Sequence, residues 1–116
     1  MEISVTNYNG GCEVDLGGEL TIYAARELKD GLLGAFGECA EVEINLSGVS
    51  DIDTAGLQVL MLAKRHATAT NKALRLVGHS RSVRELIELY NMAAFFGDPL
   101  VIPAQELDRA ANGGRV

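Results

Sequence analysis

Residues 41–63, EVEINLSGVSDIDTAGLQVLMLA, combine a strand pattern and a helix pattern and indicate the fold class of this chain. Apolar residues alternate with polar ones over residues 42–46, the period of two that is typical of a strand. Residues 48–53 are polar and turn-prone, so we expect a loop there. From Leu57 to about residue 70, apolar residues recur at helical spacing, and they predict a helix whose first half is buried on most sides. A strand, a short loop and a buried helix form the repeating unit of α/β folds.

The segments before this stretch predict a hairpin followed by a helix. Apolar and polar residues alternate on both sides of Asn9-Gly10-Gly11, and an Asn-Gly step in that setting indicates a tight β-turn. From Thr21 to about Gly37, apolar residues recur every four positions. We expect Thr21 to cap this helix and Gly37 to end it.

The segments after it predict a strand at 73–78 and a helix that ends near Tyr90, with Ser80 or Ser82 as its cap. Residues 95–99 predict an aromatic turn, and 100–102 a short edge strand. Together these elements predict an α/β domain over residues 1–104. Its mixed sheet has four to five strands, an N-terminal β-hairpin plus parallel strands, with three or four helices. We expect residues 105–116 to form a flexible C-terminal tail.

Length and charge limit the classes of function. At 116 residues the chain has room for one domain, and its net charge of -6 argues against nucleic acid as a partner. The densest basic cluster, Lys64-Arg65-His66, is interpreted as the solvated side of a helix. The first residues lack a basic segment followed by an apolar run, and no stretch of about 18 apolar residues occurs. We therefore expect a cytoplasmic protein without direct membrane insertion.

Few residues offer catalytic or metal chemistry. Cys12 and Cys39 show no CxxC spacing, and we expect two reduced, partly buried thiols. His66 and His79 are interpreted as structural or solvent-facing. The chain has no Gly-x-Ser-x-Gly elbow and no GxGxxG or Walker motif. We expect no enzymatic activity, no metal and no cofactor.

Asp53-Thr54-Ala55-Gly56 marks the start of the buried helix and is the candidate functional segment. The free N–H groups and the positive dipole end at such a position favour negative charge, so a phosphate on Thr54 would be well placed. The alternative is that Asp53 or Thr54 simply caps the helix.

Residues 45–57, NLSGVSDIDTAGL, resemble the signature of the STAS family, a strand ending in Asn-Leu or Asp-Leu, a short loop and Asp-Ser/Thr-x-Gly-Leu opening a helix. The resemblance also covers Gly18-Glu19-Leu20, the strand at 73–77 and the helix at 83–89. It implies a STAS-like fold and an anti-sigma factor antagonist that binds a kinase-type anti-sigma factor or a similar regulatory protein. Phosphorylation of Thr54 would release this partner, and a phosphatase would reverse it.

The residues implied in partner binding are Thr21, Asp53, Thr54, Ala55, Gly56 and Leu57. Two positions depart from the founding members, because Thr54 stands where Ser is usual and Thr21 where they carry Asp. The motif is also similar to that of chemotaxis-associated STAS adaptors and of the STAS subunit of phospholipid-trafficking ABC transporters. A constitutive scaffold without modification of Thr54 is therefore an open alternative.

Overall fold

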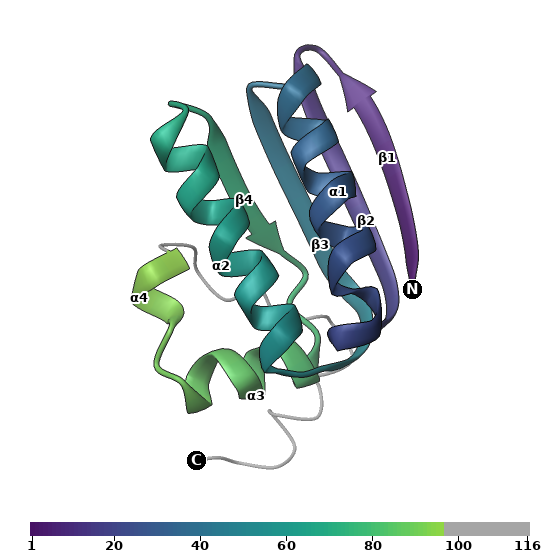
Figure 1. Cartoon of the computed structure of the whole chain (residues 1–116), viewed down its shortest axis with the longest axis vertical. Helices are drawn as coiled ribbons and strands as arrows, with labels where there is room; N and C mark the ends of the chain where they lie inside the picture. Colours follow the sequence, from purple (N-terminus) through teal and green to yellow (C-terminus); the bar gives the residue numbers. More distant parts are fainter. Residues whose placement is uncertain (97–116) are drawn as a thin grey trace, which may run out of the picture.

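The computed structural model describes residues 1–96, in which two long helices cover one face of a four-stranded sheet (Figure 1). The strand order is β1-β2-β3-β4; β1 runs antiparallel to β2, whereas β2, β3 and β4 are mutually parallel. The mixed α/β sheet predicted from the sequence is confirmed. In chain order the elements are β1 (Glu2–Tyr8), β2 (Gly11–Leu20), α1 (Ile22–Glu38), β3 (Glu41–Ile52), α2 (Thr54–Ala69), β4 (Ala73–Val77), α3 (Arg81–Leu89) and α4 (Ala93–Phe96).

The N-terminal hairpin has the turn that its sequence predicts. Asn9 and Gly10 connect β1 to β2 with φ angles of 42° and 82°, the left-handed conformation that this turn requires. Val5 pairs with Val14, so apolar residues of both strands lie on the same face of the sheet. The hairpin thus adds an antiparallel edge to an otherwise parallel sheet.

The core lies between the sheet and the helices α1 and α2. Val42, Ile44 and Leu46 of β3 are buried on the helix-covered face. On the opposite face, Glu43 of β3 pairs with Arg75 of β4 through an ion pair of 2.9 Å. Within residues 1–96 the domain therefore has two layers, and the sheet face opposite α1 and α2 carries polar side chains. The apolar stripe predicted for α1 is buried in this core, and it comprises Ala24, Leu28, Leu32 and Phe36.

Strand β3 is longer than the sequence predicts, because it includes most of the residues expected to form a loop. It runs to Ile52, and its last residues pair with the end of β2 after two register shifts. Val49 and Ile52 are buried and hold this extension against the core. Polar composition suggested a turn, but the backbone groups of β2 up to Leu20 find their partners in this segment.

The expectation of two reduced thiols is wrong in this structure, because Cys12 and Cys39 form a disulfide. Cys12 lies at the start of β2, and Cys39 directly follows α1, with 5.9 Å between their Cα atoms. Both residues are buried, with exposed fractions of 1% and 5%. Helix α1 runs back along the sheet, so its end lies beside the start of β2. The two cysteines are 27 residues apart in sequence, and this separation gave no sign that they are neighbours in space.

The last described elements follow the prediction with small changes. Ser80 caps α3 by accepting a hydrogen bond from the N–H of Val83, and the chain leaves the helix at Asn91, whose φ is 55°. The predicted aromatic turn begins inside the short helix α4. The predicted edge strand at 100–102 and the tail at 105–116 lie outside the described residues. Within residues 1–96, no helix has the length and hydropathy needed to span a bilayer.

Candidate functional site

The starts of α1 and α2 lie next to each other, at the edge where β2 and β3 end (Figure 1). Leu20 and Ile52, the last residues of these two strands, pair with each other. The backbone N–H of Asp53 then donates to the carbonyl of Leu20 at 3.3 Å. Because the strands are parallel, both chain segments turn into helices at the same edge, a common location for functional sites in α/β sheets.

The side chain of Asp53 bridges the two helix starts. One carboxylate oxygen accepts a hydrogen bond from the N–H of Gly56 at 3.0 Å, and the other accepts from the N–H of Ile22 at 3.1 Å. These bonds lower the pKa of Asp53, the bond from Gly56 most strongly, while partial burial acts in the opposite direction. The carboxylate is therefore ionised at neutral pH and accepts hydrogen bonds from the first turns of both helices.

The predicted capping role of Thr21 is not observed. Thr21 occupies the N-cap position of α1, but its side chain makes no capping hydrogen bond. The first turn of α1 also contains no acidic residue. Asp53, 31 residues after Ile22 in sequence, supplies the acceptor for the Ile22 N–H instead. The sequence could not reveal that Asp53 caps α1, because Asp53 and Ile22 come together only when β2 pairs with β3.

Thr54 is the first residue of α2 and is exposed. Its hydroxyl takes part in none of the hydrogen bonds among residues 1–96, since Asp53 serves as the side-chain cap of α2. Of the two residues considered as caps, Asp53 has this role and Thr54 does not. The hydroxyl lies at the positive end of a helix, where a negatively charged group is favoured.

Gly56 and Leu57 lie beneath this surface. Leu57 is only 4% exposed and belongs to the core. At Gly56, a Cβ atom would lie 2.3 Å from the carbonyl oxygen of Leu20, so the helix can approach the end of β2 only with glycine here. Gly56 thus allows α2 to pack closely against the end of β2 inside the domain. Thr21, Asp53 and Ala55 are half-buried, and with Thr54 they form the accessible part of the predicted site.

Ile22 and Tyr23 are exposed surface residues that were not among the site residues predicted from the sequence. They begin α1 directly beside Asp53, and their exposed fractions are 65% and 96%. The available signal was their position outside the stripe that contains the buried residues of α1. Large apolar side chains exposed next to a candidate site are typical of protein-binding surfaces.

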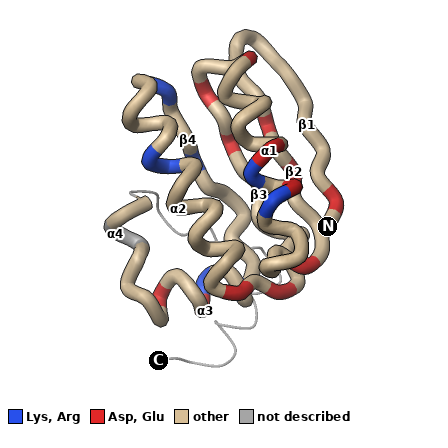
Figure 2. The backbone as a smooth tube through the Cα atoms, in the orientation of Figure 1, with Lys and Arg blue, Asp and Glu red and all other residues tan. Residues whose placement is uncertain are grey.

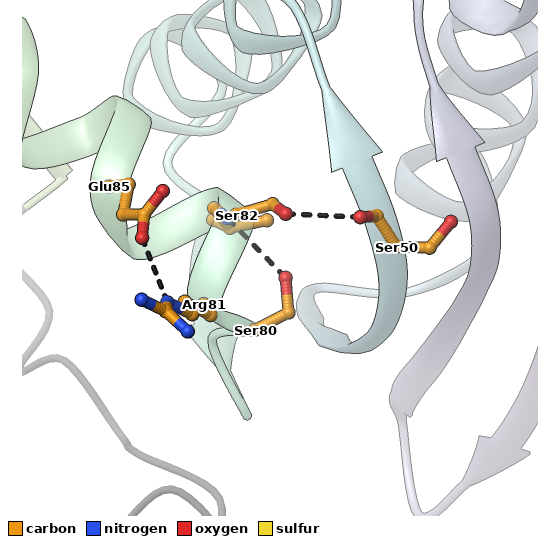
Figure 3. A network of polar contacts seen from close by, with 6 residues as sticks. Ser50, Ser80, Arg81, Ser82 and Glu85 are labelled. Atoms are coloured by element: carbon orange, nitrogen blue, oxygen red, sulfur yellow. Dashed lines mark hydrogen bonds and ion pairs between the residues drawn. The ribbon is translucent and has the colours of Figure 1, made fainter. Parts of the chain in front are cut away.

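Helix α3 is attached to the same end of β3 (Figure 3). The hydroxyl of Ser82 donates to the carbonyl of Ser50 at 3.0 Å, while Arg81 and Glu85 form an ion pair along the helix. Between α3 and β3 lies an open hollow of about 220 Å³. Its lining residues are Asp51, Ile52, Ser82, Glu85, Leu86 and Leu89.

The histidines and acidic residues form no constellation for metal binding in the part of the chain that the structure describes. His66 packs against Phe36 with 5.4 Å between ring centroids, and His79 is buried beside the start of α3. The chemistry offered at the α1–α2 edge is therefore an accessible hydroxyl, a carboxylate and backbone donors.

Sequence comparison places the chain in a family. The family profile described as "Mlab, STAS domain" matches residues 4–103, so the chain belongs to the STAS domain family. An anti-sigma-B factor antagonist of Staphylococcus epidermidis is 28% identical over 90 residues, which cover 77% of this chain and 83% of the relative.

Solved structures show the same fold. The anti-sigma factor antagonist SpoIIAA in its unphosphorylated form aligns with a TM-score of 0.72 and 15% identity, over 98% of this chain and all of the other. An anti-sigma factor antagonist from Mycobacterium paratuberculosis aligns with a TM-score of 0.75 and 20% identity, over 96% and 93%. The phosphorylated form of SpoIIAA from Bacillus aligns with a TM-score of 0.67 and 16% identity, over 94% and 99%.

Proposed function

We propose that this chain is a phosphorylation-controlled protein-binding switch of the anti-sigma factor antagonist type. In its unmodified form it binds a kinase-type anti-sigma factor or a related signalling regulator, it acts in the cytoplasm, and it has no catalytic activity of its own. The observation that supports this most directly is the exposed hydroxyl of Thr54, which no capping bond occupies. The accessible contact residues are Thr21, Asp53, Thr54 and Ala55, with Gly56 and Leu57 holding the surface from below.

The electrostatic surroundings of Thr54 make added charge effective. Glu19 and Asp51 are exposed on the strands that lead into the site, and Asp53 is ionised. Figure 2 shows acidic residues along the end of the molecule where α2 begins, and basic residues toward the other end of this helix. A phosphate would add about -1.5 to -2 charges to this acidic end. Since about 1.4 kcal/mol changes affinity tenfold, such a change is sufficient to release a protein partner.

The second candidate is a constitutive STAS subunit of a phospholipid-trafficking ABC transporter. The description "Mlab, STAS domain" of the matching family favours it. In that case Thr54 contacts the partner but is never modified, and the chain is a scaffold with the same binding edge.

Binding measurements with variants of Thr54 distinguish the two. The partner is first identified by pull-down from native lysate with mass spectrometry, and its affinity for the purified full chain is then measured by calorimetry. For the switch, Thr54→Glu weakens binding about tenfold or more, whereas Thr54→Ala preserves binding and abolishes phosphate incorporation when the partner is supplied with ATP.

The matched control is Thr68→Glu, which makes the same chemical change at an exposed position near the other end of α2. It should bind like the unmodified chain. Equal affinity of Thr54→Glu and Thr54→Ala, without phosphate incorporation into the unmodified chain, rejects the switch and supports the scaffold.

A further inference from the structure

Asp53 already binds part of the set of backbone donors that would attract a phosphate at Thr54. In the first turn of α2, the N–H of Gly56 donates to the carboxylate of Asp53 at 3.0 Å, and the N–H of Ala55 also contributes to the lowered pKa of this carboxyl. A phosphate on the neighbouring residue is drawn to the same donors. Two anionic groups would then compete for one set of N–H groups, and their like charges repel at this short range.

Asp53 is also the side-chain cap of α1. Its second carboxylate oxygen accepts from the N–H of Ile22 at 3.1 Å. Thr21 does not cap, and the first turn of α1 has no acidic residue, so no other side chain among residues 1–96 supplies this acceptor. Any rotation of the Asp53 carboxylate away from α2 therefore changes the support of the α1 start as well.

The segment supported by this bond carries the exposed apolar pair described above. Ile22 and Tyr23 begin the first turn of α1, and most of their surface is open to solvent. An exposed aromatic beside an aliphatic residue is a common anchor in protein interfaces. The contribution of Ile22 and Tyr23 to partner affinity depends on their being held in one position, because ordering a loose segment on binding reduces affinity.

We propose that Asp53 is a positioning residue that transmits the charge at Thr54 to the start of α1. Phosphorylation of Thr54 displaces the carboxylate, weakens its bond to the Ile22 N–H and loosens the first turn that presents Ile22 and Tyr23 to the partner protein. Release then results from the loss of an ordered apolar anchor as well as from direct repulsion. The physiological meaning rests on the proposed function, but the coupling itself is a property of the free chain.

The coupling is tested by NMR on the ¹⁵N-labelled full chain without any partner. Thr54→Glu is compared with Thr54→Gln, which has the same shape and no charge. We expect the negative charge to raise the pKa of the Asp53 carboxyl relative to Thr54→Gln. Exchange of the Ile22 amide hydrogen should become faster by about tenfold, the range expected when a hydrogen bond to a charged group is lost. Thr68→Glu should leave both observables unchanged.

A double-mutant cycle separates transmission through Asp53 from a general effect of charge. Asp53→Asn keeps a side-chain oxygen but removes the charge, and it should by itself speed up exchange at the Ile22 amide. Adding Thr54→Glu to Asp53→Asn should then have little further effect, because the transmitting group is already gone. Independent, additive effects of the two substitutions contradict the proposal.

The proposal is also overturned if Thr54→Glu and Thr54→Gln give the same Asp53 titration and the same exchange at Ile22. In that case, a weaker affinity of Thr54→Glu for the partner would be explained by direct repulsion alone. Conversely, a response at Ile22 combined with unchanged partner affinity removes the proposed switch and retains the coupling. The failure of either proposal is therefore recognisable separately.

Discussion

Replacing Gly56 by alanine tests whether the position of the candidate site depends on the close approach of α2 to the end of β2. The added Cβ would lie 2.3 Å from the carbonyl oxygen and 2.7 Å from the Cγ of Leu20, and 3.1 Å from the Cγ1 of Ile52. Because ordinary contacts begin near 3.5 Å, the start of α2 must move away by about 1 Å. The Leu20 oxygen also accepts the bond from the Asp53 N–H, which this movement stretches.

The expected loss of stability follows from these contacts. Overpacking costs about 1 to 3 kcal/mol and a weakened backbone hydrogen bond about 1 kcal/mol, whereas alanine gains up to about 1 kcal/mol over glycine in a helix. We expect Gly56→Ala to lower the free energy of unfolding by about 2 kcal/mol. Urea unfolding of the full chain, followed by circular dichroism because the chain has no Trp, measures this difference.

The matched control is Gly34→Ala in α1, where the added Cβ meets no atom within 4 Å apart from its chain neighbours and the backbone of its own helix. This variant should be more stable than the unmodified chain by about 0.5 to 1 kcal/mol, because only the helix preference changes. If Gly56→Ala is stabilised to the same extent as Gly34→Ala, the close approach to Leu20 does not constrain the position of α2.

Two further predictions concern Asp53 and the disulfide. Since the folded state lowers the pKa of Asp53, its charge contributes stability above the pKa of the unfolded chain, and this contribution is lost as the pH falls through the folded pKa. The stability advantage of the unmodified chain over Asp53→Asn should thus be largest near about pH 6 and shrink below about pH 4. Urea unfolding at several pH values measures this advantage, and a difference that does not change with pH would contradict the prediction. Reduction of the bond between Cys12 and Cys39, which closes a loop with a separation of 27 residues, should lower the free energy of unfolding by about 3.5 kcal/mol. Cys39→Ser should reproduce this loss and be insensitive to reductant, and equal stability with and without reductant would show that the disulfide does not stabilise the fold.

Local patterns were sufficient for most elements of the fold. The alternation in β3, the Asn9-Gly10 turn and the apolar stripe of α1 are each determined by residues close together in sequence, and the structure confirms them. The start of α2 at Thr54 could also be predicted, because the polar residue before an apolar helical run indicates a cap.

Features that need two distant segments could not be predicted in this way. Polar residues after Leu46 suggested a loop, but pairing with the end of β2 extends the strand to Ile52. Sequence separation suggested two reduced thiols, but the return of α1 brings Cys39 to Cys12.

The α/β pattern, the family signature around Thr54 and the acidic character of the chain follow from the order and composition of the residues alone. The capping of both helices by Asp53, and the exposure of Ile22 and Tyr23 beside it, became visible in the folded chain. The physical reason is that caps and strand pairs satisfy backbone groups with whatever donor or acceptor lies nearest in space. Which group that is depends on the pairing of β2 with β3, and no local pattern contains this pairing.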